Sequence, residues 1–129
     1  MTDSALQNKP DAHASSADTP WGRWEVLLDE SSCKVKKITV LPGQRLSYQK
    51  HFKRQEHWMV VEGVAKVTLN DQEHIVKTGE YMDIPQEAAH RIANESDKVM
   101  VFIEIQRGTY FGEDDIVRLQ DDYGREDKK

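Results

Sequence analysis

Residues 42–63 read PGQRLSYQKHFKRQEHWMVVEG, and this stretch decides how the chain folds. It starts with a Pro-Gly pair and ends with a glycine, and between these turn signals lie Gln49, His51 and Glu56. Gln49 and His51 are two residues apart, so on a β-strand their side chains point to the same face. Glu56 follows five residues later, which leaves room for the chain to turn and come back beside them. The stretch therefore predicts neighbouring strands that carry three potential metal ligands.

A fourth potential ligand, His90, lies in the segment GEYMDIPQEAAHRIAN of residues 79–94. Two imidazoles, a carboxylate and an amide oxygen suit zinc, manganese, iron, cobalt or nickel better than calcium or copper(I). A carboxylate inside a barrel is costly unless it meets a cation. We therefore expect one six-coordinate divalent ion, zinc or manganese, with water in its open positions. Its expected protein ligands are Gln49, His51, Glu56 and His90.

The rest of the chain is built from short strand-like segments separated by turn residues, a pattern typical of a β-sandwich or barrel. The expected strands span residues 35–41, 46–51, 57–62, 64–69, 73–76, 81–84, 90–93 and 99–106. Asn70-Asp71 between two of them predicts a tight hairpin. Residues 114–120 are expected to form a short terminal helix, so the predicted fold is all-β with one short helix.

Composition indicates one soluble globular domain in a chain of 129 residues. Residues 1–19 contain no aromatic, Val or Ile residue and are predicted to be a flexible arm. Residues 20–125 form the domain, and residues 126–129 are expected to fray. No apolar run approaches the roughly 18–20 residues that span a membrane, and no signal-peptide core is present, so we expect a cytoplasmic protein. A net charge of −5 gives no indication of a nucleic-acid surface, and Cys33 has no second cysteine to pair with.

The ligand spacing resembles the two motifs of the cupin superfamily, which implies a double-stranded β-helix, or jelly-roll barrel. In the first motif a glycine, a ligand-x-His pair, a Glu and a second glycine follow at fixed intervals. The matching residues are Gly43, Gln49, His51, Glu56 and Gly63. In the second motif Gly79, Pro85, His90 and Asn94 match, while Glu87 stands where the family has a glycine.

A closer resemblance, over residues 20–125, is to the type II phosphomannose isomerases. It is carried by the segments PWG (20–22), YQKH (48–51), RQEHW (54–58), IEIQ (103–106), GEDDIVR (112–118) and DYGR (122–125). Phe52-Lys53 depart from the family, which more often has polar or histidine residues there. In that family this cupin is commonly the C-terminal domain of a longer enzyme that also makes GDP-mannose. The resemblance implies an isomerase that interconverts mannose 6-phosphate and fructose 6-phosphate, and so feeds polysaccharide synthesis.

Such an isomerase moves a proton between C1 and C2 through an enediol, which requires a base. Lys36, His57 and Glu104 are candidates for it, as is a water molecule at the metal. A sugar phosphate also needs a donor such as the fork of an arginine. Arg54 and Arg91 are the candidates, and Arg54 is preferred because Arg91 follows His90 and should point out of the barrel.

Other functions remain open because a fold alone does not decide function. One is a non-catalytic sugar-binding or regulatory cupin, and another is an iron-dependent oxygenase, which Gln49 in a histidine position disfavours. The acidic run at residues 113–115 could form a second metal site, but capping of the short terminal helix is the preferred interpretation. GDP-mannose synthesis by this chain is not expected, because it has neither the length nor the glycine-rich phosphate loop.

A homodimer is also expected. Trp21 and Trp24 lie close together near the start of the domain, and residues 99–105 form the most apolar strand. Together they offer more apolar surface than one small barrel readily covers, and an edge strand gains protection by pairing across a two-fold axis. The alternative is that both tryptophans close the end of their own barrel.

Overall fold

The computed structural model describes residues 15–125, so most of the predicted arm (1–14) and the predicted frayed tail (126–129) lie outside it. Within the described part the chain forms eleven β-strands and no helix, so nothing there could cross a membrane as a helix. The strands are β1 (Ser16–Thr19), β2 (Gly22–Asp29), β3 (Lys34–Val40), β4 (Tyr48–Lys50), β5 (Arg54–Glu62), β6 (Val64–Leu69), β7 (Gln72–Lys77), β8 (Tyr81–Ile84), β9 (His90–Ala93), β10 (Met100–Gly108) and β11 (Val117–Gln120). The predicted all-β class is confirmed.

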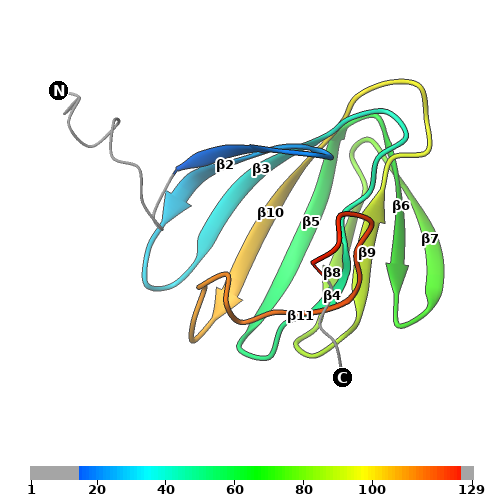
Figure 1. Ribbon diagram of the computed structural model, residues 1–129. Coiled ribbons are helices and arrows are strands. Elements are labelled where there is room, and N and C mark those ends of the chain that lie inside the picture. Colours follow the sequence, from blue (N-terminus) through cyan, green and yellow to red (C-terminus); the bar gives the residue numbers. More distant parts are fainter. Residues whose placement is uncertain (1–14, 126–129) are drawn as a thin grey trace, which may run out of the picture.

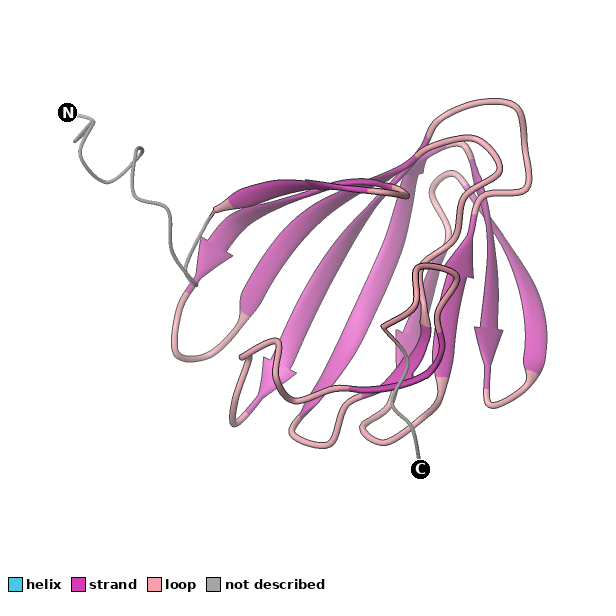
Figure 2. Ribbon diagram, in the orientation of Figure 1, coloured by secondary structure: helices cyan, strands magenta, loops and turns pink. Residues whose placement is uncertain are grey.

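The strands form two antiparallel sheets that face each other across the interior (Figures 1 and 2). One sheet has the order β1-β2-β3-β10-β5-β8, and the other has the order β11-β4-β9-β6-β7. Residues of β3, β5 and β10 from the first sheet and of β4 and β9 from the second line one cavity. This arrangement brings the two predicted ligand segments, on β4–β5 and β9, to one interior.

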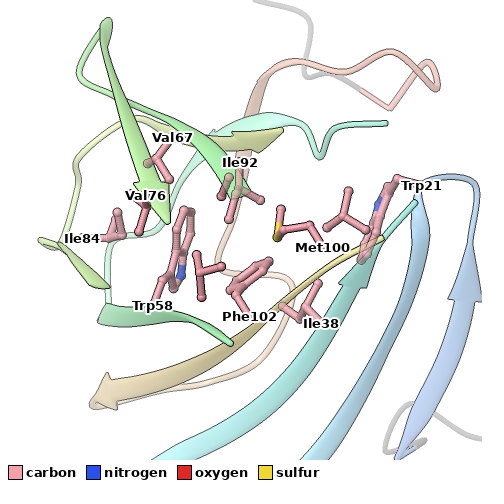
Figure 3. Packing of buried hydrophobic residues seen from close by; sticks show 12 residues of the cluster. Trp21, Ile38, Trp58, Val67, Val76, Ile84, Ile92, Met100 and Phe102 are labelled. Carbon is pink, nitrogen blue, oxygen red and sulfur yellow. The ribbon is translucent and has the colours of Figure 1, made fainter. Parts of the chain in front are cut away.

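The hydrophobic core fills one part of that interior (Figure 3). Phe102 and Met100 of β10 are fully buried, and the Trp58 ring lies 5.3 Å from the Phe102 ring. Ile92 and Val67 meet them from the opposite sheet, as Figure 3 shows. Full burial of each such side chain contributes about 1.5–3 kcal/mol to folding. The core therefore holds the two sheets together and leaves the rest of the interior to polar residues.

Two turns show how the chain bends at positions identified in the sequence. Asn70 and Asp71 both have positive φ (48° and 68°) and join β6 to β7, so the predicted hairpin is confirmed. Glu87 has φ 66°, a left-handed conformation that favours glycine. The cupin motif has a glycine at this position. The turn is kept because the Glu87 N–H donates to the His51 carbonyl oxygen (2.7 Å).

The prediction of a short helix over residues 114–120 is wrong. Asp115 N–H closes a turn onto Gly112 O, and Val117–Gln120 then pairs with β4 as β11. The acidic side chains that were expected to cap the helix bind elsewhere: Glu113 contacts Lys36, and Asp115 accepts two backbone N–H groups. These long-range contacts hold the segment extended, which local helix propensity cannot offset.

Strand pairing is also present before the predicted domain boundary at Pro20. Ser16–Thr19 forms β1 and pairs with β2 as a hairpin, so these four residues do not belong to a flexible arm. Trp21 is 6% exposed and belongs to the hydrophobic core, and Trp24 packs against that core. Both tryptophans thus cover the end of their own barrel, which was the alternative to a role in a dimer.

Candidate functional site

Three of the four predicted metal ligands come together in the interior. His51 follows β4, Glu56 lies on β5 and His90 starts β9, and all three are buried. Their possible ligand atoms all lie within 4.8 Å of one another. Gln49 is paired directly with His90 across β4 and β9, and it lines the same cavity. The register thus puts Gln49 and His90 on one wall, because directly opposite residues share a face of the sheet, while Glu56 reaches the cavity from β5 of the other sheet.

Both histidines are oriented by backbone carbonyls. His51 Nδ1 lies 2.6 Å from the Asp115 carbonyl oxygen, and His90 Nδ1 lies 3.0 Å from the Ala88 carbonyl oxygen. Because a carbonyl only accepts, each Nδ1 carries the proton and donates it. Each Nε2 is then left with a lone pair, and that of His51 accepts from Arg54 Nη2 (3.1 Å). Metal-binding histidines in proteins are held in this way.

The protonation states of the cluster suit a divalent cation. Burial lowers the pKa of His51 to about 4, although the charge of Glu56 opposes this shift, and burial also lowers the pKa of His90. Burial raises the pKa of Glu56, but the nearby positive charge of Arg54 and the two histidines outweigh it and bring the pKa to about 2. At neutral pH the cluster therefore offers two neutral imidazoles and one carboxylate. This donor set is compatible with a divalent metal.

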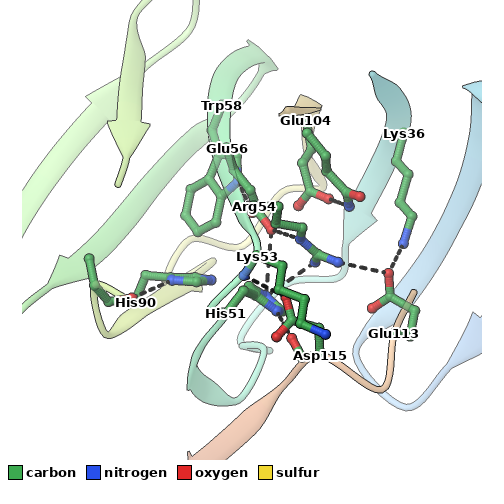
Figure 4. A network of polar contacts seen from close by, with 12 residues as sticks. Lys36, His51, Lys53, Arg54, Glu56, Trp58, His90, Glu104, Glu113 and Asp115 are labelled. Carbon is green, nitrogen blue, oxygen red and sulfur yellow. Dashed lines mark hydrogen bonds and ion pairs between the residues drawn. The ribbon is translucent and has the colours of Figure 1, made fainter. Parts of the chain in front are cut away.

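Arg54 provides the positive charge that faces this carboxylate (Figure 4). Its Nε donates to Glu56 Oε2 (2.8 Å), and its Nη2 lies 3.1 Å from His51 Nε2. A third contact joins Nη1 to Glu113 Oε2 (3.4 Å). The Arg54 side chain is only 3% exposed, and two of its three nitrogens face residues of the ligand cluster. The structure thus places the preferred substrate-binding candidate inside the ligand cluster.

The acidic run after Gly112 forms an outer layer around the cluster, not a second metal site. Asp115 supports His51 through its carbonyl, while its carboxylate accepts the N–H groups of Phe52 (3.1 Å) and Lys53 (2.9 Å). Glu113 bridges Lys36 and Arg54. Among residues 15–125, only His51, Glu56 and His90 form a group of three or more side chains able to hold a metal. Sequence reasoning missed this supporting role, although the run lies in the segment most typical of the family.

A cavity of about 200 Å³ adjoins the cluster and is lined by two of the three candidate bases. Glu104 is 6% exposed, and burial together with the charge of Glu56 raises its pKa to about 8. Gln106 Nε2 donates to Glu104 Oε2 (2.5 Å) and fixes its carboxyl group. Lys36 Nζ donates to Glu113 (2.9 Å) and lies 5.0 Å from the centre of the Trp24 ring.

The remaining candidate base, His57, and the second candidate for phosphate binding, Arg91, have other surroundings. His57 points to the outer face of β5, where Nδ1 lies 2.6 Å from Asp83 Oδ1 and the ring stacks on Tyr81. The structure therefore does not bring His57 to the cavity. Arg91 reaches the cavity wall, but its Nε donates to the Leu46 carbonyl oxygen (3.0 Å) and its Nη groups face Gln120. Those contacts tie β9 to the segment before β4 and to β11.

Solved structures confirm the predicted cupin fold. The capsular polysaccharide assembling protein CapF of Staphylococcus aureus superposes with a TM-score of 0.72 at 23% identity, over 81% of this chain and 34% of CapF. A conserved protein with a double-stranded β-helix domain from Klebsiella pneumoniae superposes with a TM-score of 0.66 at 17% identity, over 92% of this chain and 89% of that one. At these identities the likeness concerns the fold alone.

Curated relatives are closer in sequence. Alginate biosynthesis protein AlgA of Pseudomonas aeruginosa is 45% identical over 106 residues, which are 82% of this chain and 22% of AlgA. Xanthan biosynthesis protein XanB of Xanthomonas campestris pv. campestris (strain B100) is 43% identical over 82% of this chain and 23% of XanB. Mannose-1-phosphate guanylyltransferase of Sinorhizobium fredii is 41% identical over 80% of this chain and 20% of that protein.

The chain therefore spans about a fifth of the length of these relatives. The family model described as mannose-6-phosphate isomerase C-terminal matches residues 6–121, which is most of the chain. The predicted relationship to phosphomannose isomerases is confirmed: this chain belongs to the mannose-6-phosphate isomerase C-terminal family of cupin domains.

Proposed function

We propose that this domain interconverts mannose 6-phosphate and fructose 6-phosphate with the help of one divalent metal ion. The observation that carries the proposal is the convergence of His51, Glu56 and His90 beside a cavity that also contains Glu104. Gln49 is the proposed fourth ligand, because it is the cross-strand partner of His90 on the same wall. When bound, a divalent metal would polarise the oxygens at C1 and C2 of the sugar and make the C2 proton more acidic.

Glu104 is the proposed base that moves the proton. Its carboxyl group lines the cavity, and its pKa is raised to about 8. A general base works best when its pKa lies near the working pH, so Glu104 can both take up and release a proton near neutral pH. As a carboxylate, Glu104 takes the proton from C2 and leaves an enediolate. The hydroxyl proton on the C2 oxygen passes to the C1 oxygen, and Glu104, now the acid, returns its proton to C1, which gives the ketose and restores the carboxylate. The hydrogen bond from Gln106 holds the carboxyl group in place during both steps.

Lys36 fits a binding role better than that of a base. Its Nζ donates to Glu113 and lies over the Trp24 ring, so the group is already engaged as a donor. A charged ammonium donates hydrogen bonds and has no lone pair with which to accept a proton. In the proposed reaction Lys36 orients sugar oxygens in the cavity.

The product would feed GDP-mannose and polysaccharide synthesis. This part of the proposal is supported by the names of the relatives, which include alginate and xanthan biosynthesis proteins and mannose-1-phosphate guanylyltransferases. The guanylyltransferase named there is not proposed for this chain, which spans about a fifth of those proteins.

One observation favours a second candidate, a non-catalytic sugar-binding or regulatory cupin. Arg54 already neutralises Glu56 through a 2.8 Å hydrogen bond, so the carboxylate has a positively charged partner within the protein itself. A domain that only binds sugars could retain the cavity in this state.

Turnover separates the two candidates. The chain is incubated with mannose 6-phosphate, and separately with fructose 6-phosphate, in the presence of Zn²⁺ or Mn²⁺, and the sugars are followed by NMR. The isomerase brings both samples to the same mixture of the two sugar phosphates. A binding protein shifts the ligand resonances without converting them, and that result would reject the proposed activity.

We also propose that the chain forms a homodimer through the outer face of the first sheet. Ile103 is paired with Met59, and Met59 with Tyr81, so these side chains form one apolar row on that face. Met59 and Tyr81 are exposed, at 38% and 58%. A second copy would cover the row. Light scattering at micromolar concentration should give twice the chain mass, and Met59→Lys should shift it toward the monomer; a monomeric wild type contradicts the proposal.

A further inference from the structure

We propose that Arg118 on β11 forms the subsite that holds the phosphate group of the sugar, an inference that rests on the proposed function. The register carries it: Arg118 is paired with Gln49, and Gln49 is paired with His90. Directly opposite residues in antiparallel strands share one face of the sheet. The three side chains therefore form a row across β11, β4 and β9 on the inner wall, and Arg118 lines the same cavity as the two ligands.

The spacing of this row suits a hexose 6-phosphate. Neighbouring strands lie about 4.8 Å apart, so the backbone of Arg118 is about 10 Å from that of His90. A hexose with C1 and C2 at the ligand cluster carries its phosphate at the other end of the carbon chain. The row therefore separates a position for the reacting carbons from a position for the phosphate. The planar fork of an arginine matches two phosphate oxygens at once.

The two arginines predicted from sequence are directed elsewhere. Arg54 faces Glu56 and His51, so its charge is directed to the ligand cluster, where C1 and C2 would react. Arg91 contacts the Leu46 carbonyl oxygen and Gln120. Arg54 thus serves the ligand cluster and Arg91 the joint between strands, whereas Arg118 lies in the row with Gln49 and His90, two strands away from His90.

A second observation indicates that the cavity accepts an oxygen-rich ligand. The buried Oγ1 of Thr19 has no hydrogen-bond partner among the described residues, and Thr19 lines the same cavity. A buried hydroxyl without a partner costs free energy that a ligand oxygen would recover. Arg125, held in place by Asp121 (Nε–Oδ2 2.8 Å), adds another positive charge to the lining. The cavity thus offers charge and a spare hydroxyl to an anion.

The direct test uses inorganic phosphate as the probe and the full chain as the protein. Phosphate affinity is measured by calorimetric titration for the wild type, Arg118→Met, Arg118→Lys and the control Arg107→Met, which changes an exposed arginine on β10. Arg118→Met should weaken phosphate binding roughly ten- to a hundredfold. Arg118→Lys keeps the charge but not the fork and should lie between it and the wild type. Arg107→Met should bind phosphate as the wild type does.

Isomerase kinetics provide the second readout. Arg118→Met should raise KM for mannose 6-phosphate by a similar factor and change kcat less, because a remote phosphate contact serves ground state and transition state alike. The subsite is rejected if Arg118→Met binds phosphate as tightly as the wild type, or if the wild type does not bind millimolar phosphate. If Arg118→Met does not fold, the phosphate affinity of Arg118→Lys is the test. An Arg118→Lys variant that binds phosphate as tightly as the wild type overturns the proposal.

The same data separate failure of the subsite from failure of the proposed function. Phosphate binding that depends on Arg118 in a chain without isomerase activity would retain the subsite and reject the function. An active isomerase whose phosphate affinity and KM do not respond to Arg118 would retain the function and reject the subsite.

Discussion

Each face of strand β5 has a histidine beside a carboxylate, but one pair is buried and the other is at the surface. On the inner face Arg54, Glu56 and Trp58 are buried, and Glu56 lies beside His51. On the outer face His57 Nδ1 lies 2.6 Å from Asp83 Oδ1, the same distance as from His51 Nδ1 to the Asp115 carbonyl oxygen in the interior. A histidine next to a carboxylate thus occurs on both faces of one strand. Proximity of the two groups does not by itself make a site.

The two faces differ in burial and in what holds each ring. The side chain of His51 is 3% exposed and that of His57 is 37% exposed. His51 donates from Nδ1 to a backbone carbonyl, which leaves Nε2 to the cluster, whereas the Nδ1 of His57 contacts the Asp83 carboxylate. Burial also strengthens every charge interaction on the inner face, where water cannot screen it. Only the inner face combines neutral imidazoles, a buried carboxylate and a cavity.

The largest contrast is expected from removing a histidine on each face. His90→Ala should abolish isomerase activity and the rise in melting temperature on adding Zn²⁺ or Mn²⁺, since a ligand that binds only the folded state stabilises it. His57→Ala should retain both, because its ring lies outside the cavity. Activity assays and thermal melts with and without metal measure the difference. Equal losses in both variants would remove the distinction between the faces.

Glu104→Gln should be the next largest effect, with kcat reduced roughly 10²- to 10⁴-fold, the range for loss of a general base. Metal content should stay unchanged, because Glu104 is outside the ligand cluster. In the wild type kcat/KM should rise with pH and level off well above the ordinary glutamate pKa of 4.5, since the carboxylate is the active form. The exposed Glu62→Gln on the same strand as Glu56 is the control. A Glu104→Gln variant of full activity would assign the base elsewhere.

Asp115 is expected to contribute less, because it acts through His51. Asp115→Ala removes the carboxylate that accepts the N–H groups of Phe52 and Lys53, so the turn that carries His51 loosens. Metal affinity should fall roughly ten- to a hundredfold, as is common when a group that supports a ligand is lost. Asp114→Ala is the matched control, since the Asp114 carboxylate accepts a hydrogen bond from the exposed Tyr110 hydroxyl and does not support the turn that carries His51. Competition with a metallochromic dye measures both variants, and equal affinities would show that the turn does not depend on Asp115.

The smallest expected effect is a pH dependence of stability in the metal-free protein. The pKa of Glu104 is about 8 in the folded state against an ordinary value of 4.5, so between these pH values the folded state binds one proton more. The resulting stability is fully present below pH 4.5 and is lost as pH rises through 8. The melting temperature should therefore fall from pH 7 to pH 9. His51 and His90, whose pKa values are lowered, add no change in this window.

Glu104→Gln should flatten that decline, because an amide stays neutral at every pH in the range. The comparison is made after chelation, by thermal melts of both proteins in the same buffers at pH 7, 8 and 9. Parallel declines in the wild type and the variant would show that another group causes the pH dependence.

Turn residues and the two-residue period of a strand predicted several strand bounds and the two faces of β5. The bounds of β6, β8 and β9 agree with the predicted ranges 64–69, 81–84 and 90–93, because turn residues mark their ends. The period of two along a strand correctly separated Glu56 from His57. The strand register places Gln49 opposite His90. The resemblance to the cupin motifs had already predicted that these two residues lie close together.

The C-terminal segment could not be predicted from local pattern. Glu113 meets Lys36, 77 residues away in sequence, and Asp115 meets Lys53, 62 residues away. Those contacts decide that the segment is extended, and a run of acidic residues alone looks like the start of a helix. Arg118 was overlooked for the same reason, because only the pairing of β11 with β4 shows that it shares a wall with Gln49.

Calorimetric titration of the chelated wild-type chain with Zn²⁺ or Mn²⁺ tests the central claim most directly, with His90→Ala and His57→Ala measured alongside it. The predicted result is one ion per chain in the wild type and in His57→Ala, and loss of that binding in His90→Ala. Binding of one ion by all three proteins, or by none of them, would contradict a metal centre on the inner face.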